Sequence, residues 1–218
     1  MRMFDAVIRN LPFLMGGFWV TVKLTAFALL GGIPLGILVG LGRISKKRWV
    51  YYPVTFYVNL IRNIPLILVI FWFYFVMPIL VGRPMDPFPS AVISFIIFEA
   101  TYFGEILRAG YQSVSKGQIE AGYSTGLSYI QTTRHILIPI AFRRMLPSMI
   151  TQSIVTYQDT SLAFVIGLPE FVRRTAIVDN LEVRSIQLFG FVAIMFLITC
   201  YISSVVSRRF EVKREGGY

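Results

Sequence analysis

Residues Glu120–Pro139 read EAGYSTGLSYIQTTRHILIP, a polar stretch punctuated by glycines that lies between two apolar runs of membrane-spanning length. A chain that only has to cross a bilayer has no need of such a segment between its spans. Small residues such as Ala121 and Gly122 allow a short helix to sink into a groove on a partner. Glu120 can accept hydrogen bonds from cations of that partner. We therefore interpret the stretch as a docking point for another protein.

Within this stretch the residue types predict two short helices separated by a turn. The first is expected over residues 120–124, and Gly126 ends it because glycine readily adopts the backbone conformations that stop a helix. The second is expected over residues 128–134. The sequence therefore predicts a kinked element between two membrane spans that projects from the membrane and does not cross it.

The rest of the chain is apolar enough to require a membrane. Of its 218 residues 56% are hydrophobic and 15% are charged, more apolar surface than a soluble domain of this length can bury. One span needs about 20 apolar residues. Five spans are predicted in a single domain of residues 1–218, at residues 17–42, 54–81, 87–109, 136–168 and 185–207. The fold class is therefore an all-α integral membrane protein.

Interruptions are expected at three places. Pro65 disfavours helix at the residue before it and predicts a break within the second span. The fourth span carries a polar run and is expected to be broken near residues 158–161. Residues 4–13 precede the first span, end near Pro12, and predict a separate helix lying on the membrane surface.

Basic residues fix the expected orientation. One set of flanks carries about twice as many arginines and lysines as the other, and such an excess marks the cytoplasmic side. The richer set is Arg43, Lys46, Lys47, Arg48, Arg108, Lys116, Arg134, Arg143, Arg144, Arg208, Arg209, Lys213 and Arg214; the poorer set is Arg2, Arg9, Arg83, Arg173, Arg174 and Arg184. The C-terminus and residues 117–139 are thus predicted in the cytoplasm and the N-terminus outside. The net charge of +10 then reflects contact with lipid headgroups, and nucleic acid is not expected as a partner.

The order Glu120-Ala121-Gly122, then Gly126, then Ile136-Leu137-Ile138-Pro139 resembles the EAA loop of ATP-binding-cassette (ABC) importer permeases. That pattern is E-A-A, three residues, Gly, nine residues, then I-x-L-P, and the spacing matches at every step. The departures are small, with Gly122 in place of Ala and Ile138 in place of Leu. Residues 59–66, 98–110 and 158–162 further resemble the permeases that import glutamate and aspartate.

This resemblance implies the transmembrane domain of a type I ABC importer (MetI-like), with five transmembrane helices and a cytoplasmic coupling helix in the bacterial inner membrane. It assigns ATPase coupling to Glu120, Ala121, Gly122, Gly126 and Pro139. The implied partners are a cytoplasmic ATPase dimer, a second permease subunit that is identical or homologous, a periplasmic or tethered substrate-binding protein, an amino-acid substrate and membrane lipid. No phosphate-binding loop, nucleophile motif or metal-ligand spacing occurs in the sequence. The chain is therefore not expected to be an enzyme or to hold a cofactor; ATP and Mg²⁺ would bind the partner ATPase.

Ionisable residues inside predicted spans are costly and mark candidate substrate sites. Glu99 and Asp159 suit the ammonium group of an amino acid, whereas Arg62 and bared backbone amides suit its carboxylate. The full candidate set is Arg62, Asn63, Glu99, Gln158, Asp159 and Ser161. The alternative is that Glu99 or Asp159 pairs with Arg62 and only ties helices together. Glu105 and Arg108, three residues apart, are predicted to form a structural ion pair.

Three further alternatives stay open at this level. Permeases for glutamine, arginine or histidine share much of the pattern that favours glutamate and aspartate. A channel or carrier that works without ATP is the competing class, although no internal inverted repeat supports it. Gly32, Gly36 and Gly40 form a smooth helical stripe that either packs within the chain or contacts another subunit.

Overall fold

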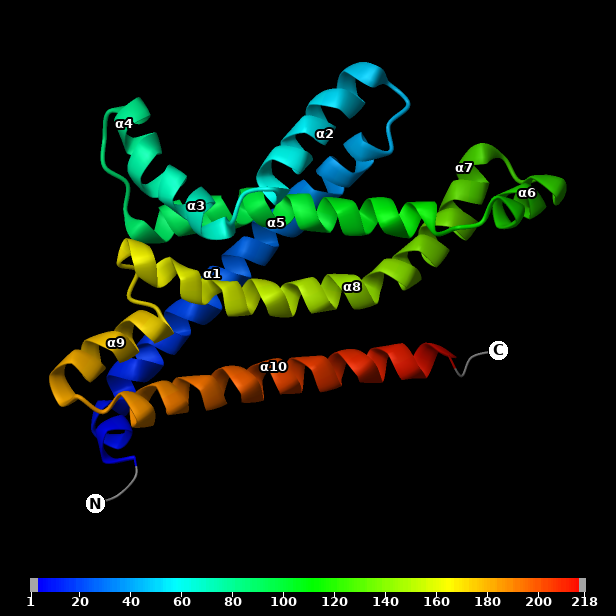
Figure 1. Cartoon of the computed structure of the whole chain (residues 1–218). Helices are drawn as coiled ribbons and strands as arrows, with labels where there is room; N and C mark the ends of the chain where they lie inside the picture. Colours follow the sequence, from blue (N-terminus) through cyan, green and yellow to red (C-terminus); the bar gives the residue numbers. More distant parts are fainter. Residues whose placement is uncertain (1–3, 216–218) are drawn as a thin grey trace.

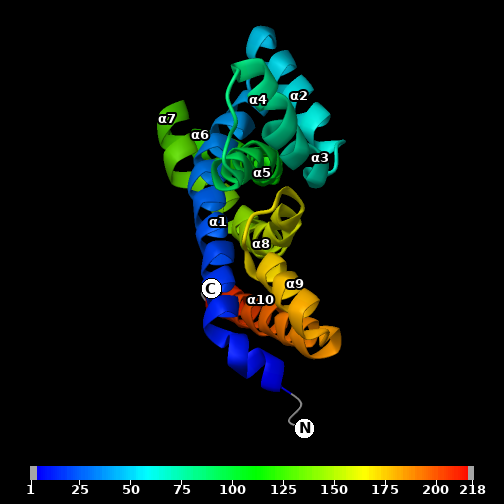
Figure 2. The same cartoon turned by 90° about the vertical axis from the view of Figure 1, so that its left-hand side faces the viewer.

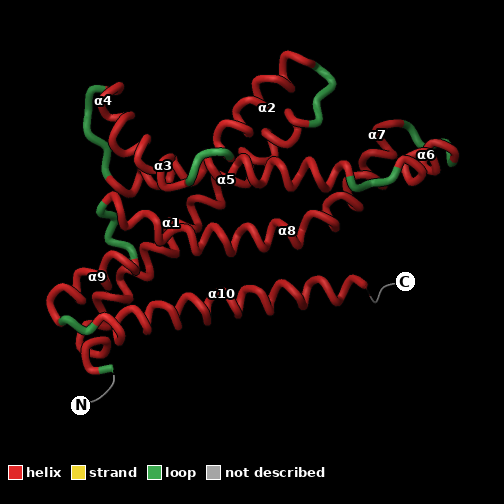
Figure 3. Tube along the Cα trace, viewed as in Figure 1, coloured by secondary structure: helices red, strands yellow, loops and turns green. Residues whose placement is uncertain are grey.

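The computed structural model describes residues 4–215, and the side chains of residues 4–205, as a bundle of helices joined by short loops, without a strand among them (Figures 1 and 3). The predicted all-α fold is confirmed. The helices are α1 (Asp5–Arg43), α2 (Arg48–Arg62), α3 (Leu66–Phe71), α4 (Met77–Val81), α5 (Pro87–Gln112), α6 (Lys116–Ser124), α7 (Tyr129–Thr132), α8 (Ile138–Asp159), α9 (Phe171–Glu182) and α10 (Ser185–Glu215). Two π-helical segments, η1 (Trp72–Val76) and η2 (Thr133–Leu137), and the 3₁₀ helix η3 (Thr160–Ile166) complete the order.

Helix α1 is a single helix of 39 residues that extends along much of the molecule (Figure 2). The prediction of a separate surface helix over residues 4–13 was wrong, because α1 continues through Pro12. A proline inside a helix removes one backbone hydrogen bond and crowds the carbonyl four residues earlier, and here packing of the flanking turns offsets that cost. Val7 and Leu14, on either side of Pro12, are buried in one cluster with Phe171 of α9 and Leu188 of α10.

The second predicted span is interrupted where Pro65 predicted a break. Helix α2 ends at Arg62, α3 begins at Leu66, and the two directions differ by 103°. Pro65 itself has an extended ψ of 139° and caps α3. The chain then turns through η1 into α4, so residues 48–81 form a bent pair rather than a straight rod (Figure 1). Both α2 and α3, on either side of the bend, pack against α5.

The glycine stripe of α1 packs against α5, which decides between the two readings of that stripe in favour of contact within the chain. A β-carbon added at Gly40 would lie 2.8 Å from the backbone oxygen of Gly104, and one added at Gly36 would lie 2.6 Å from the β-carbon of Phe103. Neither position has room for a side chain. The absence of side chains therefore allows α1 and α5 to approach each other closely.

The polar run in the fourth predicted span ends an α-helix, as expected. Helix α8 stops at Asp159, and η3 continues to a left-handed Gly167 with φ of 80°. Helix α9 follows, capped by the buried Glu170, whose carboxylate accepts from the backbone nitrogens of Val172 (2.9 Å) and Arg173 (2.6 Å). The break near residues 158–161 is thus confirmed.

Three helices among the described residues are long and apolar enough to cross a membrane: α1, α5 and residues Ser185–Val205 of α10. The bent pair of α2 with the segment Leu66–Val81 makes a fourth if it counts as one span. Helix α8 is less apolar because it includes Arg143, Arg144 and Asp159. The count of five spans therefore stays a prediction. Of the residues used to predict orientation, the side chains of Arg2, Arg208, Arg209, Lys213 and Arg214 lie outside the described residues.

Candidate functional site

The segment that resembles the EAA loop forms two short helices at the end of the rods α5 and α8 (Figure 1). Each helix begins with a reciprocal capping box, in which a serine side chain accepts from the backbone three residues on and a glutamine side chain reaches back. The pairs are Ser115 with Gln118 and Ser128 with Gln131. Such caps satisfy backbone groups that a short helix would otherwise leave open. Gly126 separates the two helices with φ of 84°, so the predicted turn and the end of the first helix at Ser124 are confirmed, although α6 begins earlier, at Lys116. The second predicted helix, residues 128–134, does not end there, because α7 continues through η2 into α8 without a loop.

The residues assigned to coupling divide into an exposed group and a packed group. Glu120, Ala121 and Gly126 are exposed, whereas Gly122 is buried between α6 and the second helix, and Pro139 is half-buried near the start of α8. A β-carbon at Gly122 would lie 2.6 Å from Cδ1 of Ile136. The Glu120 carboxylate has no partner among the described side chains. The segment thus presents an unpaired acid on a helix pair held together at Gly122.

Like Glu170 at the start of α9, Glu99 is fully buried, with none of its surface exposed. It lies in the middle of α5 against Gly32 of α1. Its Oε2 atom accepts a hydrogen bond from Nε2 of Gln152 on α8 at 2.9 Å. Its Oε1 atom has no hydrogen-bond partner within the described residues. A buried carboxylate oxygen without a donor is costly and is a candidate ligand-binding atom.

Asp159 is the second acid of this region and lies seven residues after Gln152, the residue of α8 that bonds Glu99. It is half-buried at the point where α8 changes into η3. Seven residues are about two helical turns, so Asp159 lies on the face of α8 that carries Gln152, about 10 Å further along the helix. Both acids that the sequence suggested for an ammonium thus belong to the facing helices α5 and α8, and a shared role in binding an ammonium stays a prediction.

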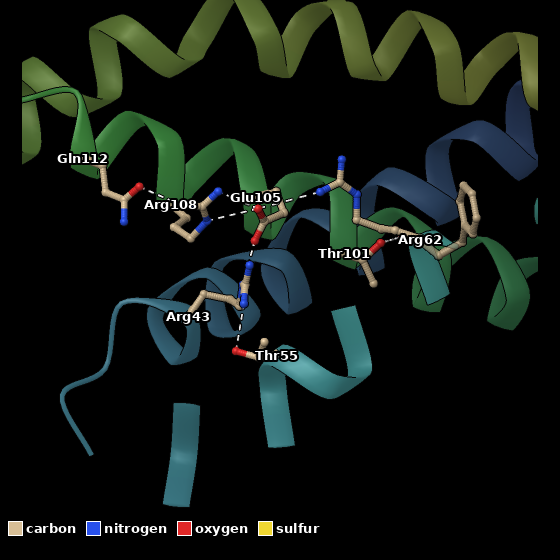
Figure 4. A network of polar contacts seen from close by, with 8 residues as sticks. Arg43, Thr55, Arg62, Thr101, Glu105, Arg108 and Gln112 are labelled. Atoms are coloured by element: carbon tan, nitrogen blue, oxygen red, sulfur yellow. Dashed lines mark hydrogen bonds and ion pairs between the residues drawn. The ribbon is translucent and has the colours of Figure 1, made fainter. Parts of the chain in front are cut away.

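Arg62 does not belong to this acidic pair. Its Nη1 atom lies 3.7 Å from Oε2 of Glu105, and its guanidinium lies over the ring of Tyr102 at 4.8 Å from the centroid. The alternative in which Arg62 pairs with Glu99 or Asp159 was wrong, because Glu105 is the acid within its reach. Figure 4 shows Arg62 approaching Glu105 from one side and Arg108 from the other.

Glu105 is the centre of a cluster that joins three helices (Figure 4). Arg108 donates to Oε2 from Nε (3.0 Å) and Nη2 (2.8 Å), which confirms the predicted pair. Arg43 of α1 donates from Nε to Oε1 at 2.7 Å, and from Nη1 to Thr55 of α2 at 2.8 Å. Both carboxylate oxygens are therefore occupied by Arg43 and Arg108. Arg62 adds a longer, third charge contact.

A cavity of about 440 Å³ lies between α5 and α8 toward the end that carries α6 and α7. Its lining includes Arg62, Arg108 and Arg144, together with Glu105 and the amide of Gln152. Gln152 is thus both a wall of the cavity and the hydrogen-bond donor to Glu99. A volume of this size is typical of pockets that hold small ligands, about 300–1,000 Å³. The cavity therefore leads from the α6–α7 end toward the buried acid.

The remaining candidates from the sequence do not gather at this place. Asn63 is exposed and lines a separate groove with residues of α2. Gln158 is exposed and contacts Cys200 of α10 through Nε2 at 3.5 Å. The hydroxyl of Ser161 donates to the backbone oxygen of Gln158 at 2.8 Å. A substrate role for these three stays a prediction.

Two residues of the site were not singled out from the sequence. Gln152 lies seven residues before Asp159, which is about two helical turns, so the spacing within the polar run could have placed both on one face of α8. Arg144 donates to the backbone oxygen of Ser113 at the end of α5. No local pattern marks that contact, because its partner lies 31 residues away.

Comparison with known proteins decides the family. Residues 32–214 match the family described as binding-protein-dependent transport system inner membrane component. The chain belongs to that family. The predicted membership in the ABC importer permeases is confirmed, and such permeases are not themselves enzymes.

Similar permeases cover nearly the whole chain. The glutamate/aspartate import permease protein GltK of Escherichia coli O157:H7 is 37% identical over 93% of this chain and 94% of its own length. The probable glutamine ABC transporter permease protein GlnP of Bacillus subtilis is 36% identical over 94% and 95%. The crystal structure of an amino acid ABC transporter with histidines has a TM-score of 0.91 at 26% identity, covering 96% of this chain and 98% of that one. An inward-facing structure of the MetNI methionine ABC transporter, at 19% identity and a TM-score of 0.74, shares the fold.

Proposed function

We propose that the chain is one permease subunit of an ATP-driven importer that moves polar amino acids, with glutamate and aspartate favoured, across the bacterial inner membrane. Family membership supports the importer, and relatives named for glutamate/aspartate and for glutamine support an amino-acid substrate. The observation that carries the proposal is Glu99, which is fully buried in α5 with one carboxylate oxygen lacking a hydrogen-bond partner among the described residues, while Asp159 lies at the end of the facing helix α8. A charged group inside an apolar span is retained where transport uses it.

In this mechanism the acidic pair binds the substrate ammonium at the middle of the bundle. Helix α8 changes into η3 at Asp159, and discontinuous helices supply backbone groups to substrates in other transporters. The cavity between α5 and α8 is the route to the cytoplasm in the inward-open state. Alternating access would open and close this route around the acidic pair.

The free energy of ATP hydrolysis reaches the permease through the α6–α7 segment. A cytoplasmic ATPase dimer would bind its exposed face, where Glu120 offers an unpaired carboxylate and Tyr129 and Ile130 are 69% and 75% exposed. Helix α6 follows α5 after three residues, and α8 follows η2 directly. A push on the segment therefore acts on both walls of the cavity. A second permease subunit and a substrate-binding protein complete the assembly, with the N-terminus outside and the C-terminus in the cytoplasm.

The test is uptake of labelled amino acids into proteoliposomes that contain the complete importer. Glutamate, aspartate, glutamine, arginine and histidine are compared, and preference for an acidic substrate is expected. Glu99→Gln and Asp159→Asn should each reduce uptake about tenfold or more, since a charge-assisted hydrogen bond contributes roughly 1.5–3 kcal/mol. Glu182→Gln, which removes a surface acid paired with Arg9, is the matched control. Unchanged uptake in both site variants would overturn the assignment of the acidic pair.

A further inference from the structure

The lining of the cavity between α5 and α8 carries a net positive charge, which Glu99 and Asp159 do not offset. Its lining contains three arginines, Arg62, Arg108 and Arg144, and one acid, Glu105, which gives a formal charge of +2. Glu99 and Asp159 do not line it. Cations in a concave, partly buried surface attract anions strongly because solvent screens them less. The positive electrostatic potential of the cavity therefore favours binding of an anion.

The three arginines differ in how fully they are occupied. Arg108 donates to both Glu105 and Gln112, and Arg144 donates to the backbone oxygen of Ser113. Within the described residues, Arg62 has only the 3.7 Å ion pair to Glu105 and its position over Tyr102. Its side chain is 39% exposed, against 13% for Glu105. Arg62 and Arg144 are thus the guanidinium groups of the cavity with donors to spare, and Arg62 is the one whose acidic partner is held mainly by other arginines.

The Glu105 carboxylate keeps its hydrogen bonds if Arg62 moves away from it. Its two oxygens already accept three hydrogen bonds from Arg43 and Arg108 at 2.7–3.0 Å. Arg62 stands at the end of α2, directly before the 103° bend. A ligand with a carboxylate can therefore take over Arg62 through a bidentate pair without leaving a buried charge uncompensated.

We propose that this cavity is a second, cytoplasm-facing binding site for the carboxylate of an acidic amino acid, held by Arg62 in competition with Glu105. This inference rests on the proposed function and adds a site on the exit route, separate from the ammonium site at Glu99 and Asp159. The hydroxyl of Ser148 and the amide of Gln152 line the same cavity and supply neutral polar partners. A substrate with two carboxylates suits a lining of charge +2 better than one with a side-chain amide.

The experiment measures equilibrium binding of labelled glutamate and glutamine to the purified permease–ATPase complex. The complex is free of nucleotide and of binding protein and is held in phosphatidylcholine nanodiscs. Wild type should bind glutamate more tightly than glutamine. Arg62→Gln should weaken glutamate binding on the order of tenfold, because it removes a charge-assisted pair, and should affect glutamine less. Arg62→Lys should retain part of the affinity, and Arg9→Gln, outside the cavity, should leave it unchanged.

Glu105→Gln separates this proposal from a merely structural role of the cluster. It removes the competitor of the ligand, so glutamate affinity should rise, whereas a structural role makes both Arg62→Gln and Glu105→Gln lower it. Thermal unfolding of each complex confirms that the variants are folded. Glutamate binding that is unchanged in Arg62→Gln, or lowered in folded Glu105→Gln, would overturn the proposal.

Two controls distinguish failure of the cavity-site proposal from failure of the proposed function. Binding is repeated in phosphatidylglycerol nanodiscs, and loss of glutamate binding there would identify a lipid headgroup as the occupant and overturn the proposal. Uptake by the complete importer is measured in parallel. If no amino acid is taken up, the proposed function fails. If uptake is normal and Arg62→Gln binds glutamate like wild type, only the cavity site fails.

Discussion

Gln152 on α8 donates a hydrogen bond from Nε2 to Oε2 of Glu99 on α5 across 2.9 Å. This bond joins the wall of the cavity to the buried acid, because Gln152 also lines the cavity. It is the donor that holds Glu99 in place among the described residues, and it comes from the opposite helix. Movement of α5 against α8 would therefore expose or cover Glu99 from the cavity side.

Removing this donor should weaken both folding and transport. Gln152→Leu leaves a fully buried carboxylate without its hydrogen bond, which costs roughly 1–3 kcal/mol or more for a charged group. We expect a lower melting temperature of the purified complex and reduced uptake. Gln112→Leu, which removes an exposed amide bonded to Arg108, is the control. Wild-type melting and uptake in Gln152→Leu would show that the bond does not matter.

The close approach of α1 and α5 should be sensitive to a single methyl group. The β-carbon of Gly40→Ala would meet the backbone oxygen of Gly104 at 2.8 Å, and a backbone atom cannot rotate away. We expect a loss of about 1–3 kcal/mol in stability, the usual cost of overpacking. Gly190→Ala in α10 meets no atom within 4 Å and should leave stability unchanged or slightly improved. Equal melting temperatures of the two variants would contradict this packing.

The turn at Gly126 should depend on backbone conformation alone. Its φ is 84°, yet a β-carbon there would meet nothing within 4 Å. Gly126→Val should therefore strain the turn by roughly 1–2 kcal/mol and reduce stimulation of the ATPase by substrate-loaded binding protein. Gly126→Asn should be tolerated better, because asparagine adopts positive φ more readily. Gly117→Val, with open space and a helical backbone, is the control. Similar ATPase stimulation in all three variants would speak against a fixed turn.

Charge reversal at Glu120 should uncouple the permease from its ATPase. The residue is exposed, and nothing in the described part of the chain pairs with it, so Glu120→Lys should leave folding and membrane insertion intact. Co-purification of the ATPase and ATP-driven uptake should fall together. Glu182→Lys makes the same reversal at an exposed ion pair far from this segment and should assemble normally. Normal assembly and uptake in Glu120→Lys would remove Glu120 from the interface.

Local features of the fold were predictable, and contacts between distant segments were not. Pro65, Gly126 and the polar run ending at Asp159 each act on their own few residues, so the sequence predicted the bend, the turn and the broken helix. Continuation of α1 through Pro12 depends on packing against α9 and α10, and rules that consider only neighbouring residues cannot predict such a contact. The pairing of Arg62 depends on the packing of α2 against α5, which places it 3.7 Å from Glu105. The sequence could show that Arg62 needs an acid but not which one.

We propose that transport by this chain is driven by an ATPase acting through α6 and α7. The most direct measurement compares uptake of labelled glutamate into proteoliposomes that contain the permease alone with uptake by the permease, its ATPase and its binding protein. We predict uptake that requires ATP hydrolysis and the complete assembly and that stays at background for the permease alone. Equal uptake by the permease alone, without ATP, would contradict the account.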